Sequence, residues 1–191
     1  MPKIADIQET PNPNAVKFIL KEPVSSGTSH SFKSAESGAD DALAKSLFDV
    51  GEVVSVFYMD KMITVEKTDD AEWDEILPAL AVPIRAAEAV KVSNGNGNRG
   101  AAAAIGGSIA AAASDDPKLV QINELLDERI RPYLAGDGGW LEVLELDEND
   151  TLKIRYEGAC GSCPSSLTGT LMAIENMIRE EIDPQITVLA V

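Results

Sequence analysis

The stretch GACGSCPSS, residues Gly158–Ser166, contains both cysteines of the chain, Cys160 and Cys163, separated by two residues. Before it, residues 151–156 alternate apolar with mostly charged side chains, the period of two that is typical of a half-buried strand. After it, apolar residues recur every three or four positions over residues 167–182, which indicates a helix with one buried face. The cysteines are therefore predicted to lie at a strand-to-helix junction.

The residues around Cys163 favour a reactive thiol. Pro164 fits the first turn of the predicted helix, where the missing N–H of proline costs nothing, so Cys163 is expected at the N-cap. Unpaired N–H groups and the positive end of the helix dipole stabilise a thiolate there. Since the thiolate binds metals and attacks disulfides, the junction is a candidate site for either chemistry.

Three interpretations of the two cysteines remain open on the residues alone. A tetrahedral zinc ion or a cubane iron–sulfur cluster takes four ligands, commonly thiolates, so a metal site here requires two copies of the chain. Thiol–disulfide exchange in a thioredoxin-like domain would need most of a sheet after the CxxC, whereas one helix and one strand, residues 186–191, follow. The third interpretation is a pair of structural cysteines beside a turn. His30 has no cysteine or second histidine nearby and is not expected to be a ligand.

Two further motifs carry a family resemblance. The run RPYLAGDGG, residues 131–139, precedes the cysteine stretch in the order and at the separation found in the NifU-like C-terminal domain of the Nfu family. That resemblance covers residues 116–191. The first half of the chain resembles the N-terminal domain of many Nfu proteins, and the similar segments are residues 10–18, 44–48 and 63–67.

The Nfu family assembles or carries iron–sulfur clusters, so the resemblance implies a function for the two cysteines. Cys160 and Cys163 of two chains would bridge a [4Fe–4S] cluster in a homodimer, with [2Fe–2S] as a transient form, and transfer it to apoproteins. Apo iron–sulfur proteins and the cluster assembly machinery would be the partners, and the chain would not be an enzyme. A thiol–disulfide oxidoreductase and a structural zinc ion at a dimer seam are the alternatives. Family members commonly have an Asp or a small polar residue at the position of Trp140. We interpret Trp140 as a candidate shield of the cluster loop.

Composition narrows the function and the compartment. The 191 residues carry 32 acidic and 16 basic side chains, which argues against binding to nucleic acid or to an anionic membrane, because both need basic surface. Two cysteines do not form a secreted disulfide scaffold, and reduced thiols suit the cytoplasm. From the residues at the N-terminus we expect no signal or transit peptide, and we expect no transmembrane helix. We therefore expect a cytoplasmic protein.

The chain reads as two small α+β domains, residues 1–90 and 116–191, joined by a flexible Gly/Ala/Asn-rich linker over residues 91–115. In the first domain we expect strands over 16–20, 30–33, 53–58 and 62–67, a helix after Asp40 or Asp41 through Phe48, and a helix over 70–89 that Pro78 and Pro83 kink or break. In the second, a helix capped by Asp116 ends near Pro132. A turn at Asp137–Gly139, a hairpin and the elements around the cysteines follow, and the cysteine loop is expected to project from the sheet edge.

Overall fold

The structure is a computed structural model that describes residues 1–90, 116–161 and 169–191. The predicted linker, residues 91–115, lies outside the described residues, as do Cys163 and Pro164. The chain divides into two compact units, each containing helices and strands, so the predicted α+β class is confirmed. In the described ranges, no helix combines the length and apolar character needed to cross a bilayer.

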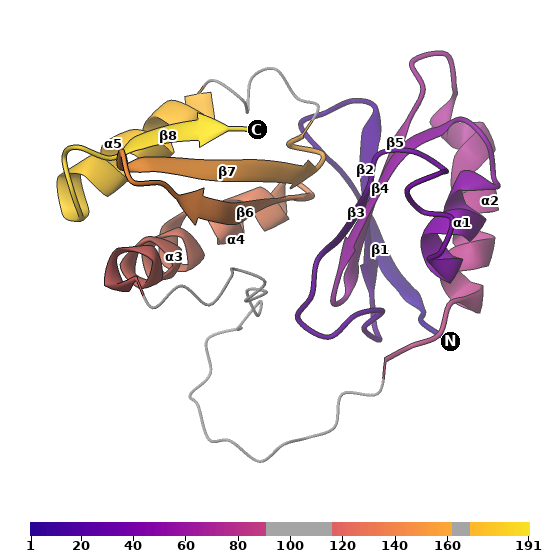
Figure 1. Cartoon of the computed structure of the whole chain (residues 1–191). Helices are drawn as coiled ribbons and strands as arrows, with labels where there is room; N and C mark the ends of the chain where they lie inside the picture. The colour runs from indigo at the N-terminus through magenta and orange to yellow at the C-terminus, as the bar shows by residue number, and fades with distance from the viewer. Residues whose placement is uncertain (91–115, 162–168) are drawn as a thin grey trace. The chain divides into compact units, whose positions relative to one another are not determined.

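The N-terminal unit is a five-stranded antiparallel sheet with two helices (Figure 1). The strand order is β1-β2-β5-β4-β3. The elements are β1 (Ile4–Glu9), β2 (Ala15–Leu20), β3 (His30–Phe32), α1 (Ala42–Phe48), β4 (Val53–Met59), β5 (Met62–Lys67) and α2 (Trp73–Ala86). Strand β1 was not predicted from the sequence, because five of its six residues are exposed and show no apolar alternation. Its pairing with β2 places it at the edge of the sheet.

Both helices of this unit pack on the apolar face of the sheet. The Asp41 carboxylate accepts a hydrogen bond from the Ala44 N–H at 2.8 Å, which confirms the predicted N-cap of α1. Helix α2 is shorter than predicted, and Pro78 and Pro83 lie inside it without breaking it into pieces. Its residues Ile76, Leu80 and Ile84 are buried in the core shared with the sheet, and this burial offsets the backbone hydrogen bonds that the two prolines cannot donate.

Tyr58 gives the N-terminal unit a predictable response to alkaline pH. Its hydroxyl donates to Asp41 Oδ2 at 2.6 Å, and burial, this hydrogen bond and the charge of Asp41 raise the pKa of Tyr58 well above its usual value. Because the folded pKa exceeds the unfolded value of about 10, the neutral phenol contributes stability that is complete below pH 10 and is lost as the pH rises above it.

We expect the stability advantage of the native chain over a Tyr58→Phe variant, about 1 kcal/mol at pH 8, to shrink between pH 9 and pH 11.5. Urea denaturation followed by Trp73 fluorescence, with both proteins in a Trp140→Phe background, measures the free energy of unfolding of this unit alone. A difference that stays constant over this range would show that Tyr58 titrates at the same pH in the folded and unfolded chains.

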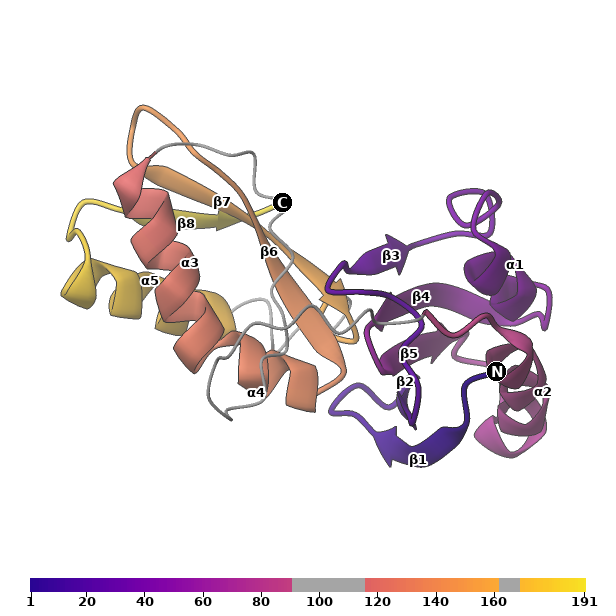
Figure 2. The same ribbon diagram turned by 90° about the horizontal axis from the view of Figure 1, so that it is seen from below.

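The C-terminal unit is a three-stranded sheet with helices on one face (Figure 2). The elements are α3 (Pro117–Arg129), α4 (Arg131–Gly136), β6 (Gly139–Leu146), β7 (Thr151–Gly158), α5 (Leu171–Glu181) and β8 (Thr187–Ala190). Strands β6 and β7 form an antiparallel hairpin, and β8 pairs with β7 in parallel. Apolar side chains of all three strands and of the helices meet in a single core. The predicted order of helix, hairpin, helix and strand is confirmed.

Two helix boundaries of this unit follow from local chemistry. Asp116 accepts a hydrogen bond from the Lys118 N–H at 2.9 Å and caps α3 as predicted. Pro132 does not simply end that helix: α3 stops at Arg129, and Pro132 lies in the first turn of the short helix α4, where its missing N–H has no partner to lose. Helix α5 confirms the predicted helix from Leu171 onward, while its predicted start and the N-cap Cys163 lie outside the described residues.

Candidate functional site

The chain turns sharply where β7 ends and brings Cys160 back onto the neighbouring strand. Gly158 pairs with Gly139 across the hairpin and has a φ of 65°, a conformation that favours glycine. The Ala159 N–H donates to the Gly138 carbonyl at 3.2 Å, and the Gly161 N–H donates to the Gly158 carbonyl at 3.0 Å. Gly138 has a φ of 77°, as expected for the predicted turn at residues 137–139. The turn and the cysteine stretch are thus one hydrogen-bonded unit.

Gly139 provides the space that Cys160 occupies. A methyl group on Gly139 would overlap the sulfur of Cys160, would lie 2.8 Å from its Cβ, and would lie 3.0 Å from the Glu157 carbonyl oxygen. Cys160 itself is 2% exposed and belongs to the core of the C-terminal unit. The expectation of a loop projecting from the sheet edge is therefore wrong for Cys160, because the bare backbone of Gly139 lets the thiol pack inward.

Tyr156 lies on the core side of β7 next to this turn. Its side chain is 3% exposed, and its hydroxyl has no hydrogen-bond partner in the described part of the chain. Burial first, and then electrostatic interaction with Cys160, raise the pKa of Tyr156 to about 12. A buried hydroxyl without a partner is unfavourable, so this one is a group available for a ligand.

Arg131 fixes the strand that carries Gly139. Its guanidinium donates to the Leu141 carbonyl at 3.1 Å, to the Asp127 carboxylate at 2.6 Å and to the Asn123 amide oxygen at 2.9 Å. It also lies 5.5 Å from the ring centroid of Trp140. Arg131 is 5% exposed and Trp140 is 3% exposed, so this cluster ties α3 and α4 to β6. Trp140 packs against Arg131, a structural role that the sequence interpretation as a shield did not include.

We expect Arg131→Lys to destabilise the C-terminal unit by about 2 kcal/mol, because a lysine cannot reproduce the fork of bonds and leaves a buried carbonyl unpaired. The matched control is Arg129→Lys. Arg129 pairs with Glu181 at 2.6 Å with both side chains largely exposed, so its replacement should change stability by less than about 0.5 kcal/mol. Urea denaturation followed by Trp140 fluorescence, with all proteins in a Trp73→Phe background, measures both changes, and equal effects would contradict the structural role of Arg131.

Of the two predicted cluster ligands, the structure describes Cys160. Cys160 is positioned by β6 and β7, whereas Cys163 lies outside the described residues. His30 lies in the N-terminal unit, where its ring stacks on that of Tyr58 with the centroids 4.6 Å apart. In residues 1–90, 116–161 and 169–191, no group of three or more His, Cys, Asp or Glu side chains could hold a metal ion.

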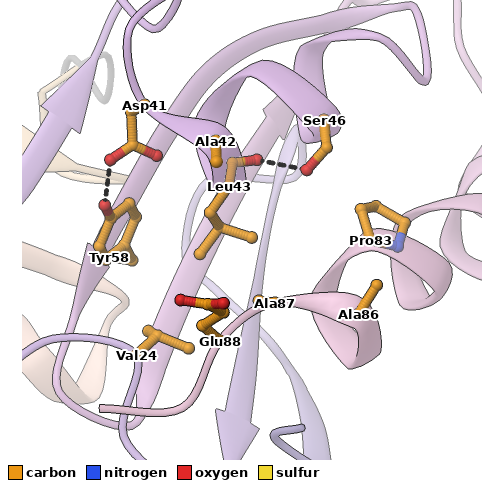
Figure 3. A pocket seen from close by; sticks show the side chains of 10 residues that line it. All are labelled: Val24, Asp41, Ala42, Leu43, Ser46, Tyr58, Pro83, Ala86, Ala87 and Glu88. Carbon is orange, nitrogen blue, oxygen red and sulfur yellow. Dashed lines mark hydrogen bonds between the residues drawn. The ribbon is translucent and has the colours of Figure 1, made fainter.

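A second feature is a pocket in the N-terminal unit (Figure 3). It has a volume of about 460 Å³ and lies between the start of α1, strand β4 and the end of α2. Asp41 and Glu88 contribute carboxylates, and Val24, Leu43 and Pro83 contribute apolar wall. Because Asp41 accepts from both Tyr58 and the Ala44 N–H, it serves as a structural cap.

Comparison with known families covers both units. A family model described as "Scaffold protein Nfu/NifU N terminal" matches residues 4–88, and the "NifU-like domain" model matches residues 122–189. The chain belongs to the Nfu/NifU-like family. The resemblance stated from the sequence motifs is confirmed, and the two family domains follow each other in the expected order.

Individual relatives agree with the family. The chain is 37% identical over 173 residues to "NifU-like protein 4, mitochondrial" of Arabidopsis thaliana, which covers 90% of this chain and 60% of the relative. It is 33% identical over 175 residues to "NFU1 iron-sulfur cluster scaffold homolog, mitochondrial" of Drosophila willistoni, covering 90% and 58%. The chain thus spans about three fifths of the length of these relatives. A Staphylococcus aureus crystal structure aligns with 43% of this chain and 98% of its own chain, at 32% identity and a TM-score of 0.39.

The predicted cytoplasmic localisation is wrong. The curated relatives from Arabidopsis thaliana and Drosophila willistoni are all named mitochondrial. The prediction rested on reduced thiols and on the residues at the N-terminus. Reduced thiols require a reducing compartment but do not distinguish one such compartment from another, and a chain that spans part of its relatives' length carries no information on targeting at its first residue.

Proposed function

We propose that this chain is an iron–sulfur cluster carrier that holds a [4Fe–4S] cluster between two subunits and delivers it to apoproteins. The observation that carries the proposal is the position of Cys160, held against Gly139 at the end of β7 and followed three residues later by Cys163. A pair of thiols at this spacing is the donor set that iron–sulfur clusters use. A relative named as an iron–sulfur cluster scaffold homolog supplies the iron–sulfur context.

The number of cysteines supports a bridged cluster. Four thiolates ligate a [4Fe–4S] cluster, and the chain contains two cysteines. Cys160 and Cys163 of one chain and the same two residues of a second chain complete the set, so the cluster-bound form is a homodimer. A [2Fe–2S] cluster uses the same four thiolates and is a second form that this site could hold.

A ligand set divided between two chains favours delivery over storage. A client that offers its own thiolates can replace those of one subunit by exchange, and the dimer then separates as the cluster leaves. In this proposal residues 116–191 carry the cluster, residues 1–90 recognise clients or the assembly machinery, and residues 91–115 link the two. Nucleic acid and membranes are not among the proposed partners, because the net charge of −16 opposes both. The role is that of a carrier and not of an enzyme.

The burial of Cys160 bears on the alternatives. An attacking thiol in disulfide exchange must reach its substrate, and reactive cysteines lie in partly exposed sites, whereas Cys160 is 2% exposed. A sulfur that ligates a cluster shared with a second chain must also be reached, so the burial of Cys160 does not separate the oxidoreductase from the carrier; the iron content of the reconstituted protein does. Structural zinc at a dimer seam would use the same four thiolates, and metal analysis separates it from an iron–sulfur cluster.

Transfer to an acceptor tests the carrier role. The protein is reconstituted anaerobically with iron and sulfide, separated from free reagents and mixed with an apoprotein that takes a [4Fe–4S] cluster, with and without an iron chelator. A carrier activates the acceptor at the same rate in both mixtures, because the cluster passes intact from thiolate to thiolate. Activation that the chelator abolishes would mean that iron leaves the protein first, and the carrier role would be lost.

A further inference from the structure

Tyr156 presents a buried hydroxyl for which neither the fold nor the proposed ligand set accounts. Its side chain packs in the core that also contains Cys160, and the hydroxyl has no hydrogen-bond partner in the described residues. An apolar residue could fill the same core position of β7 without the cost of burying a hydroxyl. The hydroxyl therefore indicates a partner that forms when the site is used.

The side chains of Tyr156 and Cys160 belong to the same core cluster, so both lie on the core side of the sheet. Side chains two apart on a strand share a face, and Gly158, the next position on that face, has no side chain to separate Tyr156 from the turn. The turn folds back onto the backbone of Tyr156, since a methyl group on Gly161 would lie 3.2 Å from the Tyr156 carbonyl oxygen. The electrostatic effect of Cys160 on the pKa of Tyr156 agrees with this proximity.

We propose that the Tyr156 hydroxyl donates a hydrogen bond to the Cys160 sulfur when that sulfur is a thiolate ligand, and that this bond slows release of the cluster. The inference rests on the proposed function. A neutral thiol is a weak acceptor, whereas a thiolate carries a charge and accepts strongly. Hydrogen bonds to the ligand sulfurs also set the reduction potential of iron–sulfur clusters, so Tyr156 is a positioning residue for both retention and potential.

The test compares Tyr156→Phe with Tyr133→Phe in the full chain. Both changes remove one phenolic oxygen, but Tyr133 is 75% exposed in the same unit and serves as the matched control. After reconstitution, we expect Tyr156→Phe to bind as much iron as the native protein but to lose it to a chelator about tenfold faster. Its reduction potential should shift to a more negative value, because a donor to sulfur has been removed. Tyr133→Phe should match the native protein in both.

In the protein without a cluster, we expect Tyr156→Phe to raise the thermal stability. Without a cluster the Tyr156 hydroxyl is buried at a cost, so Tyr156→Phe should melt at a higher temperature than the native protein. Unchanged release and unchanged potential in a variant that binds iron normally would overturn the role of Tyr156. A native protein that binds no cluster would instead overturn the proposed function itself, so the two failures are distinguishable.

Discussion

Replacing Cys160 with serine is expected to abolish iron–sulfur cluster binding while both units stay folded. A serine hydroxyl does not ionise at neutral pH and cannot replace the thiolate that iron requires. The substitution leaves a small hydroxyl against Gly139, at a cost of about 1–2 kcal/mol, well below the stability of an ordinary domain. Iron content after anaerobic reconstitution should fall from about four atoms per two chains to the background level. Cys163→Ser should have the same effect.

The control for this experiment is His30→Ala. It removes the single histidine of the chain, which lies in the N-terminal unit and stacks on Tyr58. The variant should therefore bind the full amount of iron. If Cys160→Ser or Cys163→Ser retained the native iron content, the ligand assignment would be wrong. If His30→Ala lost its iron, cluster binding would depend on the N-terminal unit, which would contradict a ligand set confined to Cys160 and Cys163.

Gly139→Ala is expected to destabilise the C-terminal unit by about 2–3 kcal/mol and to prevent normal cluster loading. The added methyl group overlaps the Cys160 sulfur and lies within 3.0 Å of the Glu157 carbonyl oxygen, which is backbone and cannot easily move aside. Cys160 must then leave its place at the end of β7. Urea denaturation followed by Trp140 fluorescence in a Trp73→Phe background gives the change in free energy, and iron analysis after reconstitution gives the change in loading.

Gly136→Ala is the matched control, three residues earlier in the chain. A methyl group on Gly136 would meet no atom within 4 Å, and Gly136 is the last residue of α4. Alanine should therefore leave cluster loading unchanged and change the stability by less than about 1 kcal/mol. Equal effects of the two alanines would contradict the view that Gly139 makes room for the thiol.

The sequence was sufficient to predict the elements whose patterns are local and regular. Alternation over residues 151–156 predicted β7, and the spacing of apolar residues from Leu171 onward predicted α5. Asp41 and Asp116, each just before an apolar run, predicted the starts of α1 and α3. In each case the deciding signal lies within a few residues: an N-cap hydrogen bond, or the regular spacing of apolar residues in a helix or strand.

The features that the sequence did not predict depend on contacts between distant residues. Strand β1 is mostly exposed and has no apolar alternation, so the sequence pattern did not reveal its pairing with β2. Burial of Cys160 depends on Gly139, twenty-one positions earlier in the sequence, because the absence of a side chain there creates the space. The role of Arg131 depends on a carbonyl of β6 and on two side chains of α3. One local signal for the role of Arg131 was present in the sequence: Asp127 lies four residues, about one helical turn, before it.

The central claim is that two chains share one cluster through Cys160 and Cys163. Native mass measurement of the reconstituted protein, kept free of oxygen and combined with iron and sulfide analysis of the same sample, tests it most directly. A cluster shared in this way should give a dimer that carries about four irons and four sulfides. A colourless monomer, a dimer that contains zinc in place of iron, or a monomer that holds a complete cluster would each contradict it.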